Sequence, residues 1–203
     1  MTDEKRLPGR IVIFAFAALL VVALAGAFLI QRSNSDRIVL PVLGQVPEFS
    51  FTAAHTGQPF GRDDLYGKIT VMDFIFTRCP GVCPVMADKM GDLYQRFDRH
   101  DEVQFVSVTV DPDYDSLPVL LEYAEAQGVT DDRWVFLRGP VDEVVALAEG
   151  GLKLPMGELP AGHSSKFVLI DSNGQIRGYY NSQDDEGPLK LQHHLRALAG
   201  ALE

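Results

Sequence analysis

Two cysteines, Cys79 and Cys83, are the residues whose type and spacing most directly indicate chemistry. They are the only cysteines among the 203 residues, and each is followed by a proline. Three kinds of site use such a pair: a structural disulfide, a thiol–disulfide redox couple and a soft-metal site. A disulfide that closes so short a loop removes little chain entropy, well below the roughly 3 kcal/mol expected for a 15-residue loop. A reactive role in redox exchange or metal binding is therefore favoured over a purely structural one.

The pair lies between a predicted strand and a predicted helix, and this position also favours reactivity. Pro84 suits the first turn of a helix, where its missing N–H group does no harm. Cys83 then lies near the helix N-terminus, where the helix dipole and free N–H groups are expected to favour the thiolate. A thiolate is both the nucleophile of disulfide exchange and a ligand for soft metal ions.

A metal ion held by two thiolates alone would be under-coordinated, so a third ligand is needed. His163 is the candidate, because it lies in the Gly- and Pro-containing loop "GELPAGHSS" that leads directly into a predicted strand. In a sheet with this order of elements, that loop can lie beside the cysteines at the strand end. The remaining histidines are expected at the surface: His55, His100, His193 and His194.

The elements that must position these residues alternate between strand and helix. A hairpin is predicted at 49–60, a strand covered on both faces at 69–76, and a helix from Pro84 to Phe97. The pattern then predicts a strand at 103–110, a helix at 116–128, a strand at 133–139, a helix at 141–150, a hairpin at 166–180 and a helix at 187–202. Alternating strands and helices give a parallel sheet, and the late hairpin adds antiparallel strands. The predicted fold class is α/β, with a central mixed sheet flanked by helices.

An apolar run from Ile11 to Ile30 predicts a transmembrane helix. Its 20 residues carry no charge, and at about 1.5 Å per residue they span about 30 Å, the thickness of the hydrocarbon core. The basic residues before the run orient the N-terminus towards the cytoplasm. The alternative is a cleaved signal peptide, because small residues at 23–27 offer cleavage sites.

The expected organisation is a single-pass protein of a bacterial inner membrane with its domain in the periplasm. Its parts are a cytoplasmic tail (1–10), an uncleaved anchor (11–30), a tether (31–46) and the domain (47–203). From Gln31 onward, 15 Lys and Arg residues stand against 26 Asp and Glu residues, a formal charge of −11. A domain this acidic is a poor nucleic-acid binder, so no nucleic-acid partner is expected.

Three motifs together resemble the Sco/SenC family of membrane-anchored, thioredoxin-like copper chaperones for cytochrome c oxidase. They are "CPGVCP" (79–84) after an apolar strand, "TVDPDYDS" (109–116) after the next strand, and "GHS" (162–164) before a strand–turn–strand hairpin. The resemblance runs from about Val46 to the C-terminus.

The resemblance implies a thioredoxin-like fold and copper, as Cu(I) or Cu(II), bound by Cys79, Cys83 and His163. It implies delivery of copper to the dinuclear copper centre of oxidase subunit II or to another copper enzyme, with a copper-donor protein as the source. The alternative function is a thiol–disulfide oxidoreductase that reduces the recipient's cysteines, with Cys79 and Cys83 as the redox pair. Disulfide exchange does not need His163, so this residue discriminates between the two functions.

Other thiol families fit less well. A peroxiredoxin is disfavoured because Met72 and Phe76 stand where that family has proline and threonine. The Trp-Cys-Gly-Pro-Cys motif usual in thioredoxins is also absent.

Several neighbours of the motifs have open roles. Gly81 stands where the Sco/SenC family often has a larger, frequently acidic residue. The glycine makes the local charge less negative and does not remove a ligand. Asp111 and Asp115 are either turn and helix-capping carboxylates or a docking site for a partner. Met86 and Met90 are potential soft ligands, but their helical spacing favours core packing.

Overall fold

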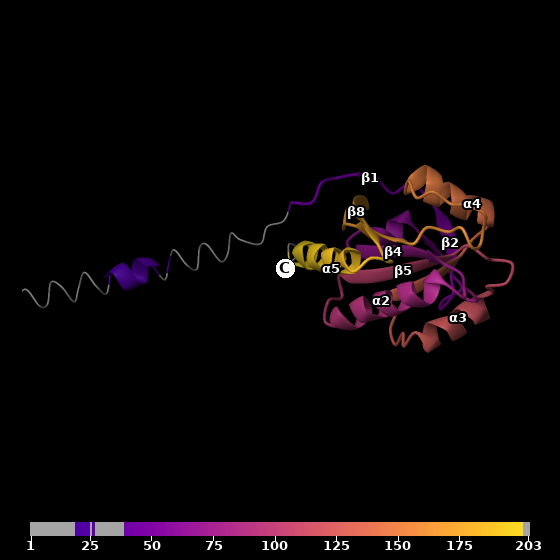
Figure 1. The fold of residues 1–203 in the computed structure, drawn as a ribbon, viewed down its shortest axis with the longest axis horizontal. Helices are drawn as coiled ribbons and strands as arrows, with labels where there is room; N and C mark the ends of the chain where they lie inside the picture. The colour runs from indigo at the N-terminus through magenta and orange to yellow at the C-terminus, as the bar shows by residue number, and fades with distance from the viewer. Residues whose placement is uncertain (1–18, 25, 27–38, 201–203) are drawn as a thin grey trace, which may run out of the picture. The chain divides into compact units, whose positions relative to one another are not determined.

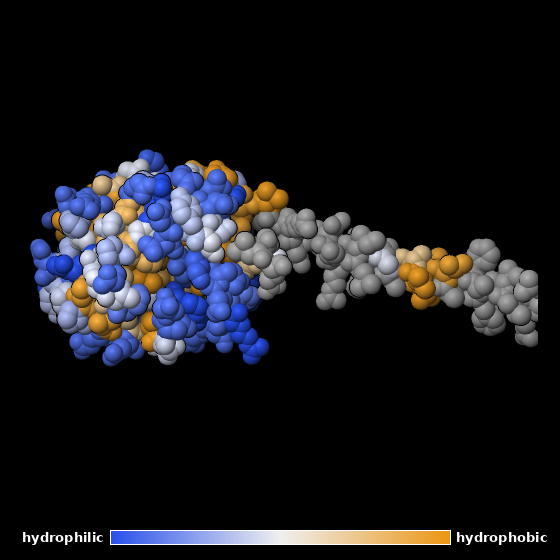
Figure 2. Space-filling view, turned by 180° about the vertical axis from the view of Figure 1, so that it is seen from behind, coloured by the Kyte–Doolittle hydropathy of each residue, from blue (hydrophilic) through white to orange (hydrophobic). Residues whose placement is uncertain are grey.

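The structure, a computed structural model, describes residues 19–24, 26 and 39–200. Chain contacts separate two units, Met1–Val39 and Leu40–Glu203. In the first unit, residues 19–24 are helical and apolar (Figure 2). Within the described ranges, no helix combines the length and the apolar character that a bilayer crossing requires. The predicted tail, most of the predicted anchor and most of the predicted tether lie outside these ranges.

The second unit is built on one eight-stranded mixed sheet. Its strands are β1 (Gly44–Gln45), β2 (Ser50–Ala53), β3 (Pro59–Gly61), β4 (Ile69–Ile75), β5 (Val103–Thr109), β6 (Trp134–Arg138), β7 (Lys166–Ile170) and β8 (Gln175–Asn181). They are ordered β1-β8-β7-β4-β5-β6-β2-β3. Strands β4, β5 and β6 run parallel, and the remaining neighbours pair antiparallel. This is the mixed α/β architecture that the sequence predicts.

Helices connect the parallel strands and close the domain (Figure 1). They are α2 (Val82–Arg96), α3 (Leu117–Ala126), α4 (Val141–Val145) and α5 (Glu186–Ala199), with short turns η1 (Arg62–Leu65) and η2 (Ala146–Gly151). Helix α2 begins two residues earlier than predicted, so that Cys83 is inside its first turn. The helix predicted at 141–150 changes to a wider π-helical turn at Ala146. Ser116 occupies the N-cap position of α3, as expected, but its side chain makes no capping hydrogen bond.

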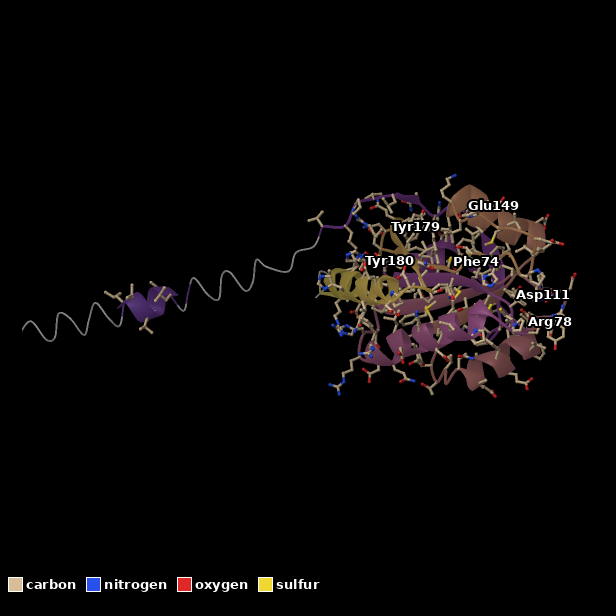
Figure 3. All side chains as sticks on the ribbon, in the orientation of Figure 1. Phe74, Arg78, Asp111, Glu149, Tyr179 and Tyr180 are labelled. Carbon is tan, nitrogen blue, oxygen red and sulfur yellow. The ribbon has the colours of Figure 1, made fainter. Side chains whose placement is uncertain are left out.

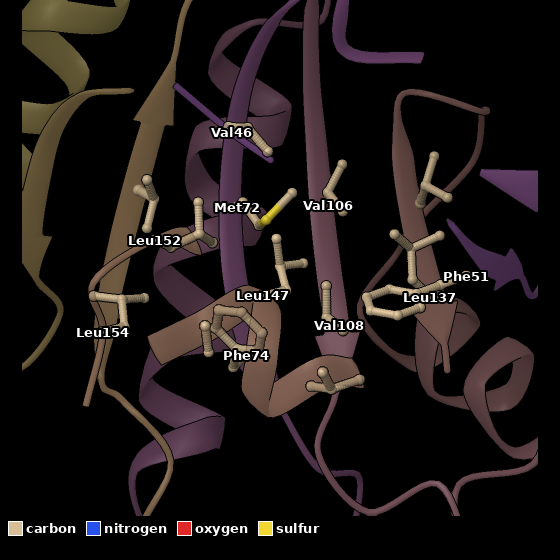
Figure 4. Close-up of a cluster of buried hydrophobic side chains, with 14 of the residues drawn as sticks. Val46, Phe51, Met72, Phe74, Val106, Val108, Leu137, Leu147, Leu152 and Leu154 are labelled. Carbon is tan, nitrogen blue, oxygen red and sulfur yellow. The ribbon is translucent and has the colours of Figure 1, made fainter. Parts of the chain in front are cut away.

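One face of the central strands carries the main hydrophobic cluster (Figure 4). Met72 and Phe74 of β4 and Val106 and Val108 of β5 are completely buried there. They pack in the same cluster as Leu147 of η2, so the α4–η2 segment covers this face.

Aromatic residues fill the opposite face, because successive side chains of a strand point to alternate sides. The Tyr94 ring of α2 contacts the rings of Phe105 and Trp134, and Tyr123 of α3 contacts Phe136. In Figure 1, α2 and α3 accordingly lie on the other side of the sheet from α4. Strand β4 is therefore covered on both faces up to its C-terminal end, where the cysteine loop begins.

The edge of the sheet begins before the predicted domain boundary. Gly44 and Gln45, which fall in the tether predicted from the sequence, pair with β8. Val46 is fully buried in the main cluster. The Val46 N–H group donates to the carbonyl oxygen of Gly174 at 3.0 Å.

Candidate metal centre

The structure brings together the three residues that the sequence singled out. One sulfur or nitrogen atom from each of Cys79, Cys83 and His163 lies within 4.8 Å of the others. Cys83 Sγ lies 3.1 Å from His163 Nε2, across 80 residues of sequence. In the part of the chain that the structure describes, this is the one group of three or more Cys, His, Asp or Glu side chains close enough to share a metal ion.

Strand pairing explains why His163 reaches the cysteines. Strand β7 runs antiparallel to β4, with Met72 opposite Val168 and Thr70 opposite Ile170. The start of β7 therefore lies at the C-terminal end of β4, where the cysteine loop leaves the sheet. His163 precedes β7 by three residues and falls beside that loop.

The His163 ring presents its Nε2 atom to Cys83. Its Nδ1 atom lies 3.1 Å from the carbonyl oxygen of Ser164. A carbonyl oxygen can only accept, so Nδ1 carries the hydrogen and donates it, which leaves the Nε2 lone pair directed at the cysteines. Burial lowers the pKa of His163, although the hydrogen bond to Ser164 acts in the opposite direction. A buried, neutral imidazole with a fixed tautomer suits a metal ligand.

The protonation of Cys83 differs from the expectation. The position of Cys83 at the start of α2 predicts a stabilised thiolate. In the structure, the pKa of the Cys83 thiol is raised, first by burial, and then by its contact with Cys79 and by the charges of Cys79 and Asp73. Desolvation outweighs the helix dipole because the side chain lies inside the core cluster, with a relative exposure of 1%. Without a metal ion, Cys83 is therefore a thiol that can donate to His163 Nε2.

Phe76 contacts Cys79, Cys83 and His163, a role that was not predicted from the sequence. Its carbonyl oxygen accepts the N–H of Cys79 at 3.3 Å, and its backbone also hydrogen-bonds Cys83. Its ring packs edge-on against the His163 ring, with centroids 5.6 Å apart. The sequence feature that could have indicated this role is an aromatic residue directly before Thr-x-Cys.

The acidic segment after β5 faces inward at Asp115. This residue is completely buried, so it is not exposed for docking to a partner. Its carboxylate accepts hydrogen bonds from the backbone N–H and the hydroxyl of Thr77, which lies two residues before Cys79. Asp111 forms an ion pair with Arg78, whose Nη2 atom is 3.0 Å from Asp111 Oδ2.

The other candidates stay out of the site. Met86 and Met90 are fully buried, in agreement with core packing. The remaining histidines form no part of the cluster: His55 and His193 are exposed, His100 contacts Glu102, and His194 contacts Tyr180.

The donor set has a definite chemical preference. Two sulfurs and one imidazole nitrogen make a soft, three-coordinate site, and three protein ligands leave room for a further ligand. Sulfurs on a metal at about 2.3 Å are at most about 4.6 Å apart, which is compatible with the observed spacing. Thiolates with imidazole fit Cu(I), and the same set accommodates Cu(II).

Comparison with known proteins points to one family. The model of the SCO1/SenC family matches residues 44–199. The crystal structure of a SCO1/SenC family lipoprotein from Bacillus anthracis is 30% identical and superposes with a TM-score of 0.72, over 80% of this chain and 99% of that one.

Two further solved structures bear on the chemistry of the site. BsSco, a member of the Sco family of cytochrome c oxidase assembly proteins with an identified disulfide switch, is 26% identical, with a TM-score of 0.70 over 80% of this chain and 98% of that one. Yeast Sco1 with copper bound is 28% identical, with a TM-score of 0.60 over 77% of this chain and 90% of that one.

Proposed function

Because the chain belongs to the SCO1/SenC family, we propose that it is a copper-binding assembly factor for cytochrome c oxidase. Cys79, Cys83 and His163 hold the ion, and the recipient is the dinuclear copper centre of oxidase subunit II. The observation that carries this proposal is the convergence of two sulfurs and a correctly oriented imidazole within 4.8 Å. A copper-bound relative with the same fold supports it.

The incomplete ligand set suggests how copper leaves. Three protein ligands leave a position through which a thiolate or imidazole of the recipient can bind the ion before this chain releases it. Cys79 is half-buried while Cys83 and His163 are buried. Cys79 is therefore the ligand through which exchange with a partner begins.

Thiol–disulfide exchange is the second candidate function. It is favoured by the proximity of two reduced thiols and by the disulfide switch of BsSco. Copper binding needs both thiolates, so oxidation of the pair expels the metal and bound metal protects the pair. One site can therefore serve both roles in turn.

A membrane-anchored, periplasmic location completes the proposal. It rests on the apolar run at 11–30 and the basic residues before it. A reporter enzyme fused after Glu203 should be active only outside the cytoplasm. A shortened, soluble chain released by signal peptidase would contradict the uncleaved anchor.

Copper titration of reduced full-length protein in detergent tests the metal site. We expect one copper ion per chain and loss of tight binding in Cys79→Ser and in Cys83→Ser. The variant His163→Ala should lose most Cu(II) affinity and less Cu(I) affinity, because two thiolates already satisfy the softer ion.

His100→Ala is the matched control, since His100 contacts Glu102 and lies outside the cluster. Competition against a chelator measures each affinity. Unchanged Cu(II) binding by His163→Ala would remove His163 from the ligand set and favour the oxidoreductase.

A further inference from the structure

A buried carboxylate ties the residues before Cys79 to a neighbouring strand. Asp115 accepts the backbone N–H of Thr77 at 3.2 Å and the hydroxyl of Thr77 at 2.5 Å. It also accepts the hydroxyl of Thr109, the last residue of β5, at 2.5 Å. Three donors, two from the turn after β4 and one from the end of β5, thus converge on one side chain that has no exposed surface.

Hydrogen bonds of this kind are strong. A hydrogen bond to an ionised acceptor is shorter than one between neutral groups and about twice as strong. In a low-dielectric interior the arrangement is stiff, because a carboxylate that loses a donor there is left underpaired. Thr77 is therefore fixed through both its backbone and its side chain.

A second contact from the same segment holds Arg78. Arg78 Nε donates to Asp111 Oδ2 at 3.0 Å, and the guanidinium carbon lies 4.3 Å from the Tyr114 ring centroid. Figure 3 shows Arg78 and Asp111 at the same end of the domain. Arg78 is exposed, so this ion pair is expected to contribute less than the buried hydrogen bonds of Asp115.

These contacts act on the site through Cys79. Cys79 follows Arg78 directly, and its position decides whether the two sulfurs are spaced for a metal ion or for a bond to each other. A disulfide requires about 2.05 Å between sulfurs, whereas two ligands of one metal ion lie several ångströms apart. Holding Thr77 restricts the movement that would close this gap.

We propose that Asp115 is a positioning residue for Cys79, which it holds at metal-ligand spacing through Thr77. This inference rests on the proposed copper function. It replaces partner docking as the role of Asp115, and it assigns Thr77 to the support of the metal site.

The test compares donors to the same carboxylate in reduced full-length protein in detergent. Thr77→Val and Asp115→Asn remove contacts to the cysteine loop, and Thr77→Ser keeps the hydroxyl. Thr109→Val removes a contact to Asp115 without touching the loop, although it also removes the acceptor of the Asp111 N–H. Asp113→Asn, on an exposed residue of the same segment, is the charge control.

Three measurements are made on each variant. They are Cu(II) affinity by chelator competition, the thiolate-to-Cu(II) absorption band, and the Cys79–Cys83 disulfide equilibrium in a glutathione series. Urea unfolding of the apo protein separates stability from positioning.

We expect Thr77→Val and Asp115→Asn to weaken Cu(II) binding by about tenfold or more, to shift the absorption band and to move the equilibrium towards the disulfide. The double variant should be no worse than Asp115→Asn, because the two residues share one interaction. Thr77→Ser should recover most of the effect. Thr109→Val should reduce stability comparably while changing copper affinity much less.

Equal losses of copper affinity in Thr77→Val and Thr109→Val, in proportion to stability, would overturn the proposal and leave Asp115 a structural residue. Absence of copper binding in the wild-type protein would contradict the proposed function instead. In that event the disulfide equilibrium still decides on Asp115, because it needs no metal.

Discussion

At the scale of single residues, Asp73 stands out within β4. All seven residues of the strand are buried, and among the described residues neither carboxyl oxygen of Asp73 has a hydrogen-bond partner. Burial raises the pKa of Asp73 to about 7. The folded protein therefore keeps Asp73 protonated under conditions in which the unfolded chain ionises it.

Replacing Asp73 should change how stability depends on pH. Between about pH 4 and pH 7 the unfolded state has released the proton and the folded state retains it, so stability falls as pH rises and levels off above pH 7. A pKa change of this size corresponds to at most about 4 kcal/mol. Asp73→Asn should raise the free energy of unfolding at pH 8 by up to that amount, and change it little at pH 4.

Urea unfolding at a series of pH values measures this difference. Asp113→Asn, which removes one exposed carboxylate, is the control and should leave the slope unchanged. Parallel stability curves for wild type and Asp73→Asn would show that Asp73 does not titrate between the two states.

At the scale of elements, the loop before β7 is as important to the site as the cysteine loop. Two backbone hydrogen bonds join the ends of this loop. The Gly157 N–H donates to the Gly162 carbonyl at 2.8 Å, and the Gly162 N–H donates to the Glu158 carbonyl at 2.7 Å. A Cβ atom on Gly162 would lie 2.7 Å from the backbone nitrogen of Glu158. This close approach requires glycine immediately before His163.

Gly162→Ala should therefore displace His163 without altering a ligand. Because backbone atoms surround the added methyl group, the loop must move, and we expect about a tenfold loss of Cu(II) affinity with a smaller loss for Cu(I). Gly81→Ala is the matched control, since a Cβ at Gly81 meets no atom within 4 Å. Chelator competition for both ions measures the effect, and equal affinities for Gly162→Ala and wild type would mean that the loop does not set the imidazole position.

Sequence patterns predicted the elements well and the environment of the site less well. The apolar runs of β4 and β5, and the Asn173-Gly174 turn of the last hairpin, where Gly174 has φ 70°, are local signals. The burial that raises the pKa of Cys83 comes from a core cluster whose members lie throughout the domain, and the inward direction of Asp115 depends on Thr77, 38 residues away. Spacing along the chain indicates which residues can meet, but it does not show how deeply they are buried.

At the scale of the whole molecule, the folded unit starts before the sheet's first hairpin. Arg177 donates to the carbonyl oxygen of Leu40 at 2.8 Å and also pairs with Asp171. Leu43 N–H donates to Ile176 at 2.8 Å. The segment from Leu40 to Val46 is thus part of the second compact unit. This segment lies on the side of the sheet that carries β8, away from the cysteine loop at the end of β4.

Two truncated chains test this boundary. A chain that begins at Leu40 should fold and bind copper as the full chain does. A chain that begins at Pro47 loses the burial of Val46 and the hydrogen bonds to β8, so its free energy of unfolding should fall by about 2–4 kcal/mol. Its copper affinity in the absence of denaturant should change little, because every ligand and its supporting strands remain. Urea unfolding and copper competition on both chains separate the two effects. Equal unfolding midpoints would show that β1 adds nothing to stability. A large loss of copper affinity in the chain that begins at Pro47 would show that the sheet edge and the metal site are coupled.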